Sequence, residues 1–389
     1  MELRMTTEID IIDADSHIIE PADLWTSRVP TRLQHFVPQV DVKPGSTSGT
    51  PRWRIQGTWL SPVGAHNYAG WPHYPPDLPS TLADGDPAGW DPTIRLERMD
   101  EYGIHAQVLY PNIIGMYTEA FIAAGPEVSL ACTQAYNDYL IEFVATDPSR
   151  FIPIAMIPFW DLDEAIREIE RCADKGHKGL LFPNQLERVG LPHFTDPYWD
   201  RVYAAAQASH LSINFHVGFG LEDLEHSDAE RRETFDPRWT ARRNAVAMMV
   251  SNGVGLSHLL TSGLCDRFPN LWFVSVESGM GYVPYLIDSL DWHWRGHGAH
   301  LRHELLPSEY FRRQCAGTFW FETSTLDLLE LYPDNFMFET DFPHPTSLSP
   351  GPASPAEVPR DHVKRHLAHI NVNVLRKVLY ENAARIYGL

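Results

Sequence analysis

Residues of the kinds that bind divalent metals stand where apolar segments of the chain end. Asp15 and His17 close the segment Ile-Asp-Ala-Asp-Ser-His. His216 closes Ile-Asn-Phe-His, and Asp341 follows Phe-Met-Phe-Glu-Thr. Carboxylates and imidazoles without thiolates suit a catalytic ion, with Zn²⁺ as the first choice and Mn²⁺ or Fe²⁺ as alternatives. The pattern predicts one divalent metal centre and, with it, an enzyme.

Each of these residues also has an ordinary structural explanation when it is taken alone. Asp15 could cap a turn, and His17 could be a surface histidine. His216 could be a hydrogen-bonded core residue, and Asp341 could cap a helix or form a loop ion pair. Alternate side chains of a strand share one face, so Asp13, Asp15 and His17 should project together, with Asp13 one layer deeper. Because burying the charge of Asp341 is costly without a compensating cation, the set as a whole favours metal binding.

The segments that position these residues alternate between short apolar strands and amphipathic helices. The expected strands are Ile9–Asp13, Ala106–Tyr110, Phe151–Ile157, Gly179–Phe182, Leu211–Phe215, Leu271–Val276, Thr318–Glu322 and Phe336–Thr340. The expected helices are Asp161–Lys175, Pro197–Ser209, Arg243–Phe268 as two helices, Val283–Trp294, Arg360–Ile370 and Val374–Ile386. Continuous apolar runs are typical of parallel strands covered on both faces. The alternation predicts an α/β fold, a (β/α)₈ TIM barrel formed by residues 1–389 as one domain.

Residues 37–92 interrupt this alternation after the first strand. They are rich in Pro, Gly, Trp and Tyr, and they contain one expected strand pair, Arg52–Ile55 with Thr58–Leu60. We interpret them as an inserted, lid-like excursion over the barrel mouth. Their aromatic residues could cover an aromatic substrate or, more simply, form a small core for the insertion: Trp53, Trp59, Tyr68, Trp71 and Tyr74.

Composition limits the classes of partner. The chain has 31 basic and 51 acidic residues, for a net charge of −20, which argues against nucleic acid and anionic membranes and favours a small-molecule substrate. The four cysteines are widely spaced, as expected of reduced side chains without a metal role. With neither a signal sequence nor a long apolar stretch, we expect a cytoplasmic protein.

The motifs together resemble the amidohydrolase superfamily, in the branch that contains aminocarboxymuconate-semialdehyde decarboxylase and γ-resorcylate decarboxylase. The resemblance rests on Asp15-x-His17, on Asn-Phe-His216, on residues 273–288, on Glu-Thr-Asp341-Phe-Pro-His-Pro and on the closing Glu-Asn-Ala-Ala-Arg-Ile-Tyr-Gly-Leu. It implies a distorted barrel with one divalent metal held by Asp15, His17, His216 and Asp341. It also implies a homodimer or a larger assembly of identical chains.

The reaction type depends on Glu277, which stands where these decarboxylases carry a catalytic histidine after the sixth strand. This departure makes a hydrolase our first expectation: a metal-activated water attacks an amide, ester, lactone or C–C carbonyl bond, and Asp341 moves the proton. Glu277 would orient the substrate or serve as a second acid or base. The alternative is a non-oxidative decarboxylase of an aromatic or unsaturated acid, in which Asp341 protonates the carbon. A hydratase and a non-catalytic barrel are further alternatives.

Several other residues are weaker candidates. His344 could face the substrate or stabilise its loop. A decarboxylase would need a cation near the substrate carboxylate, and four arginines could supply it: Arg28, Arg52, Arg54 and Arg242. His293 and His297 share a helical face, but without a recognised metal motif they indicate a surface or interface helix.

Overall fold

The computed structural model of the protein describes residues 9–218 and 237–389, and for residues 237–244 it describes the backbone alone. Its main sheet contains eight strands: β1 (Ile12–His17), β5 (Ala106–Tyr110), β6 (Phe151–Met156), β7 (Gly179–Leu181), β8 (Ser212–His216), β9 (Phe273–Val276), β10 (Cys315–Phe319) and β11 (Phe336–Phe338). They pair in this order, and each neighbouring pair is parallel. Every residue of these strands is buried, as expected of a sheet covered by helices.

The sheet curls until its first and last strands meet. Ser16 and Phe342 form an isolated parallel bridge. The backbone N–H of Asp341 donates to the carbonyl of Asp15 at 2.9 Å, and that of His17 donates to the carbonyl of Phe342 at 2.6 Å. The predicted (β/α)₈ TIM barrel is thus confirmed, and its seam joins the segments that carry Asp15, His17 and Asp341.

Beneath the seam, the carboxyl of Asp13 on β1 accepts hydrogen bonds from β5 and from the segment that follows β11. Its carboxyl accepts from the backbone N–H of Thr340 at 2.7 Å, from the Thr340 hydroxyl at 2.5 Å and from Nε2 of Gln107 at 2.8 Å. Asp13 therefore lies one layer below the metal-type ligands and holds the barrel closed, whereas Asp15 and His17 stand at the strand's end.

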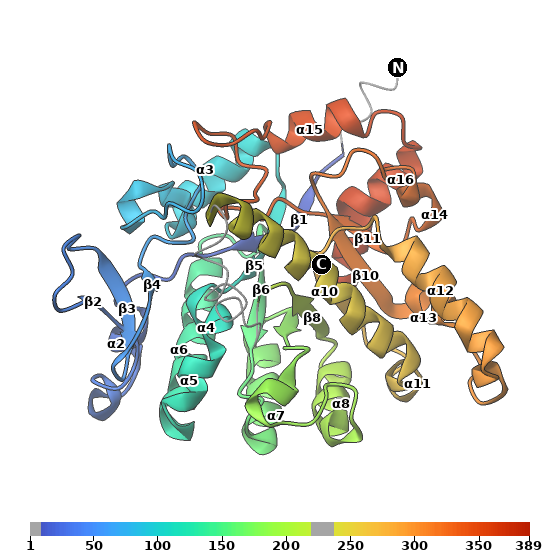
Figure 1. The fold of residues 1–389 in the computed structure, drawn as a ribbon, viewed down its shortest axis with the longest axis horizontal. Coiled ribbons are helices and arrows are strands. Elements are labelled where there is room, and N and C mark those ends of the chain that lie inside the picture. Colours follow the sequence, from blue (N-terminus) through green and yellow to red (C-terminus); the bar gives the residue numbers. More distant parts are fainter. Residues whose placement is uncertain (1–8, 219–236) are drawn as a thin grey trace.

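Helices lie between successive strands and around the barrel (Figure 1). They are α2 (Leu24–Arg28), α3 (Pro92–Tyr102), α4 (Ile113–Met116), α5 (Thr118–Ala123), α6 (Pro126–Val144), α7 (Leu162–Lys175), α8 (Asp200–Ala208), α10 (Pro237–Thr261), α11 (Leu264–Arg267), α12 (Val283–Gly296), α13 (Pro307–Gln314), α14 (Leu328–Leu331), α15 (Pro359–His366), α16 (Val372–Arg376) and α17 (Asn382–Tyr387). The caps of α7 are those expected, since Asp161 accepts from two backbone N–H groups and Gly176 closes the helix at φ 99°. Within the described residues, no helix is both long and apolar enough to cross a membrane.

Several element ends differ from the sequence expectation. The expected strand Thr318–Glu322 is placed too late, because β10 ends at Phe319 and the Glu322 carboxylate accepts from the backbone N–H groups of Met280 and Gly281 at 2.8 and 3.0 Å. The expected strand Phe336–Thr340 is too long, because β11 ends at Phe338 and Thr340 donates its N–H and its hydroxyl to Asp13. The expected helix Arg360–Ile370 stops at His366.

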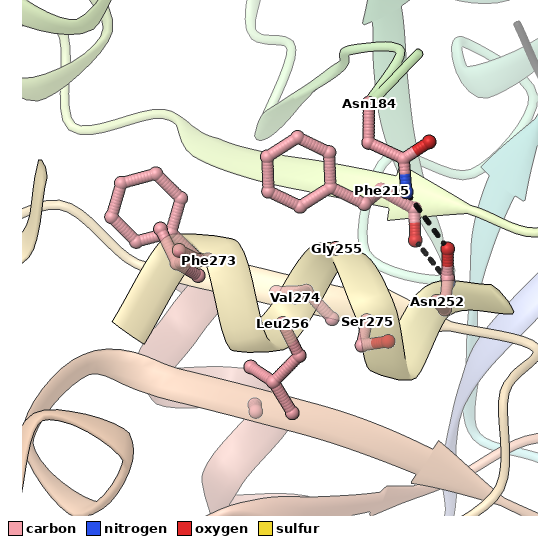
Figure 2. A pocket seen from close by; sticks show the side chains of 10 residues that line it. Asn184, Phe215, Asn252, Gly255, Leu256, Phe273, Val274 and Ser275 are labelled. Carbon is pink, nitrogen blue, oxygen red and sulfur yellow. Dashed lines mark hydrogen bonds between the residues drawn. The ribbon is translucent and has the colours of Figure 1, made fainter. Parts of the chain in front are cut away.

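Helix α10 packs closely on two barrel strands. The Asn252 side chain donates to the carbonyls of Phe215 and Val276 at 3.1 and 3.2 Å, and its own oxygen accepts from Asn184 at 3.2 Å. Figure 2 shows Asn252 with Asn184 and Phe215 at the edge of a small pocket between α10, β8 and β9. Gly255 makes the approach possible, since a Cβ there would lie 2.9 Å from Nδ2 of Asn184.

The insertion forms a separate antiparallel sheet, seen beside α2 in Figure 1: β2 (Gln39–Val42), β3 (Pro51–Ile55) and β4 (Thr58–Pro62). Its aromatic residues do not act as one group. Trp53 is fully buried against Trp25 of α2, with ring centroids 5.2 Å apart, whereas Tyr74 is 56% exposed. Trp53 therefore belongs to a core that joins the insertion to the barrel.

A second part of the insertion touches the loop that follows Asp341. The backbone N–H groups of Tyr68 and Ala69 both donate to the carbonyl of Pro343, at 2.8 and 3.2 Å. The ring of His66 lies with its centroid 6.0 Å from that of His344. Residues 64–69 thus lie next to the loop that carries two candidate site residues.

Candidate metal centre

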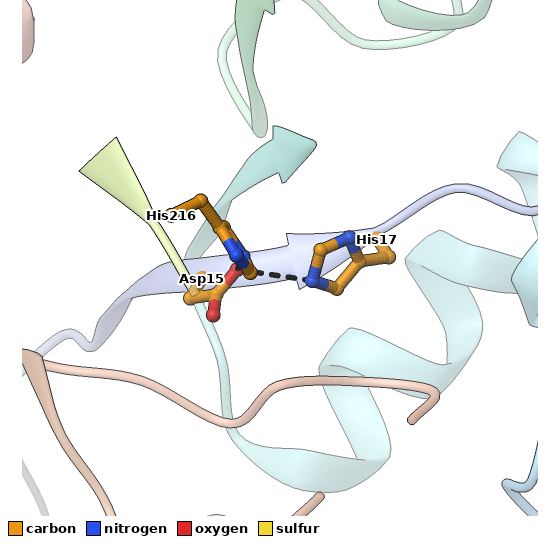
Figure 3. Close-up of side chains that lie close together, drawn as sticks. All are labelled: Asp15, His17 and His216. Carbon is orange, nitrogen blue, oxygen red and sulfur yellow. Dashed lines mark hydrogen bonds and ion pairs between the residues drawn. The ribbon is translucent and has the colours of Figure 1, made fainter. Parts of the chain in front are cut away.

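The ligand-type residues predicted from the sequence meet in one place, at the C-terminal ends of β1, β8 and β11. Figure 3 shows Asp15, His17 and His216 turned toward one another. Oδ1 of Asp15 lies 3.2 Å from Nε2 of His216 and 3.4 Å from Nε2 of His17. Nε2 of His17 is 3.5 Å from Oδ1 of Asp341. Residues separated by more than 300 positions in the chain therefore converge within the span of one ion's coordination shell.

The two histidines present their Nε2 atoms to the centre because their other nitrogens are occupied. Nδ1 of His17 lies 3.0 Å from the carbonyl of Pro111, and Nδ1 of His216 lies 2.8 Å from the carbonyl of Val217. A carbonyl can only accept, so each Nδ1 carries the hydrogen and each Nε2 keeps a lone pair. Backbone carbonyls commonly orient metal-binding histidines in this way.

The donor set fits a divalent ion. Three overlapping groups each place one ligand atom per residue within 4.8 Å of the others: Asp15, His17 and His216; His17, Asp341 and His344; Asp15, Glu277 and Asp341. Oδ2 of Asp15 is buried and accepts no hydrogen bond from the described residues. A buried carboxylate oxygen without a donor is costly unless a cation compensates it. Asp15, His17, His216 and Asp341 are thus able to hold one metal.

The carboxyls of the site differ in the direction in which the protein shifts their pKa values. Burial, and then the charge of Asp341, raises the pKa of Asp15 and of Glu277 well above their ordinary values. Burial, and then the charge of Asp15, does the same to the pKa of Glu339. Burial opposes ionisation of Asp341 too, but the charge of His344 and the contact of its Nδ1 with the carboxylate outweigh it and lower the pKa of Asp341. Environments that separate carboxyl pKa values in this way are typical of acid and base pairs.

Glu277 and Asp341 share an unusual backbone conformation. Their φ angles are 52° and 56°, in the left-handed region that costs a residue with a Cβ about 1–2 kcal/mol. Glu277 follows β9 directly, and this turn brings its Oε2 to 3.7 Å from Nδ1 of His216. The hydroxyl of Thr346 donates to Oδ2 of Asp341 and lies 3.4 Å from Oε1 of Glu277. The strain therefore accompanies the placement of both carboxyls at one site.

His344 lies between the centre and a buried amide. Its ring stacks on His17 with centroids 3.8 Å apart, and its Nδ1 is 2.8 Å from Oδ1 of Asp341. Its Nε2 is 2.6 Å from Oδ1 of Asn112, whose amide is oriented because Nδ2 donates to the carbonyl of Ile18 at 2.6 Å. His344 thus contacts Asp341 directly and is held in place from behind.

Sequence reasoning did not single out three residues of the site: Asn112, Glu339 and Thr346. Glu339 could have been found, because it stands two positions before Asp341 in the same motif and strand alternation places both on one face. Asn112 and Thr346 lie on loops, where no periodicity predicts the direction of a side chain.

The arginines considered for a substrate carboxylate are engaged elsewhere or lie outside the described side chains. Arg28 pairs with Glu142. Arg52 donates to the carbonyl of Leu60 at 2.8 Å, and Arg54 donates to Gln39 at 2.9 Å. The side chain of Arg242 lies outside the described residues. His293 and His297 lie on α12 with ring centroids 5.9 Å apart. Neither belongs to the groups of ligand-type residues at the barrel centre.

The comparisons with known proteins agree with this geometry. The family model described as Amidohydrolase matches residues 12–389. The γ-resorcylate decarboxylase of a Polaromonas species is 28% identical over 282 residues, which cover 69% of this chain and 80% of that protein. An amidohydrolase from Mycobacterium avium subsp. paratuberculosis superposes with a TM-score of 0.75 at 19% identity, covering 98% of this chain and all of the other. A 5-carboxyvanillate decarboxylase from Novosphingobium aromaticivorans, solved with manganese, gives a TM-score of 0.66 at 16% identity and covers 98% of this chain and 97% of its own.

Proposed function

This chain belongs to the amidohydrolase family, and from that premise we propose that it is a metal-dependent decarboxylase of a hydroxylated aromatic carboxylic acid. Hydrolysis was our first expectation from the sequence. The relatives with named activities favour the alternative, because they are decarboxylases of γ-resorcylate, 5-carboxyvanillate and 2-amino-3-carboxymuconate-6-semialdehyde. The observation that carries the proposal is geometric: the buried carboxyls of Glu277 and Asp341 both lie next to the hydroxyl of Thr346, beside a complete set of metal-type ligands.

Asp15, His17, His216 and Asp341 are the residues that we assign to the metal. A divalent ion held there would supply positive charge for an anionic substrate. Manganese in a relative makes Mn²⁺ a candidate beside Zn²⁺. Since Arg28, Arg52 and Arg54 contact other parts of the chain, we assign recognition of the carboxylate to the metal centre itself.

Decarboxylation requires one proton at the ring carbon. The bond between that carbon and the carboxylate breaks, CO₂ leaves, and the bonding electron pair remains on the carbon and takes up the proton. We assign this proton to Glu277, because its buried carboxyl lies 3.7 Å from His216 and next to Thr346 at the edge of the ligand set, and burial raises its pKa. Asp341 was our candidate from the sequence, but its lowered pKa favours a role as ligand and acceptor. His344, 2.8 Å from Asp341, holds that carboxylate in place.

Glu277 would in this way act from the position at which the resemblance implies a catalytic histidine. The hydroxyl of Thr346, which lies near both Glu277 and Asp341, would orient the two carboxyls relative to each other. We further propose that residues 64–69, which lie against the loop after Asp341, limit the access of water to the site.

A substrate panel tests the proposal. The metal-loaded protein is incubated with 2,6-dihydroxybenzoate and 5-carboxyvanillate, with aryl esters and anilides of matched size as the second arm, and CO₂ and hydrolysis products are measured. We expect CO₂ from at least one acid, carboxylation of the product in excess bicarbonate, and loss of both in Glu277→Gln at unchanged metal content. If the protein turned over only the esters or amides, the decarboxylase proposal would be wrong and the protein would be a hydrolase. Full activity of Glu277→Gln would remove Glu277 from the proton transfer.

A further inference from the structure

His66 is a part-buried histidine of the insertion to which the proposed reaction gives no role. It lies between β4 and α3, and its ring centroid is 6.0 Å from that of His344. The ring of His344 stacks in turn on that of His17, with centroids 3.8 Å apart. Three imidazoles therefore lead from the candidate metal centre to the insertion.

One nitrogen of the His66 ring is left without a partner. Nε2 is buried and makes no hydrogen bond with the described residues. Leaving a buried polar atom unpaired costs about 1–3 kcal/mol, and an apolar ring of the same shape would avoid that cost. Because buried side-chain nitrogens are nearly always paired, the position of Nε2 indicates a partner that comes from outside the chain.

The backbone around His66 is held in place by other parts of the chain. The side-chain Nδ2 of Asn67 donates to the carbonyl of Asp86 at 3.1 Å. The backbone N–H of Tyr68 donates to the carbonyl of Pro343 at 2.8 Å, on the loop after Asp341. A side chain on a fixed backbone loses little freedom when it binds a ligand, so a hydrogen bond to it contributes more to affinity.

The charge of the His66 ring limits which group it could bind. Burial, and then the charge of His344, lowers the pKa of His66 to about 3, so the ring is neutral at pH 7. A divalent ion at the barrel centre would favour the neutral ring further. Nε2 of a neutral imidazole is a donor in one tautomer and an acceptor in the other, and a hydroxyl group can pair with either. The ring therefore suits an uncharged hydroxyl group, whereas the metal suits the carboxylate.

We propose that His66 is a specificity-determining residue whose Nε2 forms a hydrogen bond with a ring hydroxyl of the substrate, one that is additional to any hydroxyl beside the carboxylate. The inference rests on the proposed function and narrows its substrate class to aromatic acids with at least two hydroxyl groups. A site built to bind a hydroxyl in this way discriminates against the analogue that lacks it, because its own polar atom then stays unpaired.

Binding of nitrophenols to the metal-loaded protein tests this inference by calorimetry. The planar nitro group replaces the carboxylate and cannot leave as CO₂. The ligands are 2-nitrophenol and three forms with one further hydroxyl, 2-nitroresorcinol, 4-nitroresorcinol and 2-nitrohydroquinone. At least one of the three should bind about tenfold more tightly than 2-nitrophenol. His66→Phe should remove this advantage and leave the affinity for 2-nitrophenol unchanged, whereas His66→Gln, which keeps a donor and an acceptor, should retain part of it.

His73→Phe is the matched control, because His73 is an exposed histidine of the same insertion. It should bind all four ligands as the unmodified protein does. The inference would be overturned if no further hydroxyl improved binding, if the advantage persisted in His66→Phe, or if His66→Phe weakened all four ligands equally. CO₂ release from the acids decides the proposed function separately, since none of these ligands can release CO₂.

Discussion

The backbone at Glu277 yields a prediction that separates geometry from chemistry. Glu277→Gly should be more stable than Glu277→Ala, although both variants lack the carboxyl and neither should release CO₂. The reason is the φ angle of 52°, at which a Cβ crowds the following carbonyl oxygen. Since both variants lose the same functional group, the difference between them reports the backbone alone.

The magnitude follows from two opposing effects. Alanine in the left-handed region costs about 1–2 kcal/mol, whereas glycine ordinarily costs about 0.5–1 kcal/mol relative to alanine through the entropy of the unfolded chain. At position 277 the glycine variant should therefore be more stable than the alanine variant by up to about 1.5 kcal/mol. At Ala204, an exposed position inside α8, only the second effect acts, so Ala204→Gly should lose about 0.5–1 kcal/mol.

Urea-induced unfolding of the metal-free proteins measures these differences. At each position we subtract the free energy of unfolding of the alanine form from that of the glycine form. This difference should be about 1–2 kcal/mol larger at position 277 than at position 204, which is the cost of the left-handed conformation itself. Equal comparisons at the two positions would refute the reasoning, because Glu277 would then have an ordinary backbone, and its carboxyl would not be turned toward His216 in the way described.

Three further predictions concern the residues around the centre. Asp341→Asn should abolish CO₂ release and weaken metal binding by about tenfold or more, measured against a chelating dye, whereas unchanged affinity would exclude Asp341 as a ligand. Burial raises the pKa of Asp13 from 3.8 to about 7, so the folded protein keeps a proton that the unfolded chain has lost, and stability should fall by up to about 4 kcal/mol as pH rises from about 4 to 8. Asp13→Asn should remove that part of the pH dependence in urea unfolding, and an unaltered profile would contradict it. Gly64→Ala should lower Tm and activity, because its Cβ would lie 2.1 Å from the carbonyl oxygen of Thr81, whereas Gly296→Ala, which meets no atom within 4 Å, should change neither.

The fold could be predicted from the sequence because its strands are continuous apolar runs that match their observed positions closely. The prediction of Ala106–Tyr110 matches β5 at both ends, and the ends of the other strands differ from the prediction by up to four residues. The shifts have side-chain causes. Glu322 and Thr340 continue apolar segments in sequence, yet both use their polar atoms to bind neighbouring backbone or Asp13. Such contacts depend on segments far away in the chain, which periodicity does not describe.

The candidate site was predictable where its residues sit on strands and less so where they sit on loops. Asp15, His17 and His216 belong to strands, so their direction follows from alternation. Asp341 was recognised from its motif. Thr346 and Asn112 are set by the turns after β11 and β5, and the electrostatic contrast between Glu277 and Asp341 arises from neighbours that only the folded chain brings together.

The central claim is that a divalent ion held by Asp15, His17, His216 and Asp341 supports decarboxylation, and a metal titration of the depleted protein tests it most directly. Protein stripped with a chelator is titrated with Mn²⁺ or Zn²⁺, and bound metal and CO₂ release from a responsive acid are measured on the same samples. The account predicts no CO₂ release without metal and a linear rise that ends near one ion per chain bound at the barrel centre. CO₂ release that persists in the stripped protein, or that rises equally in His216→Ala, would contradict it.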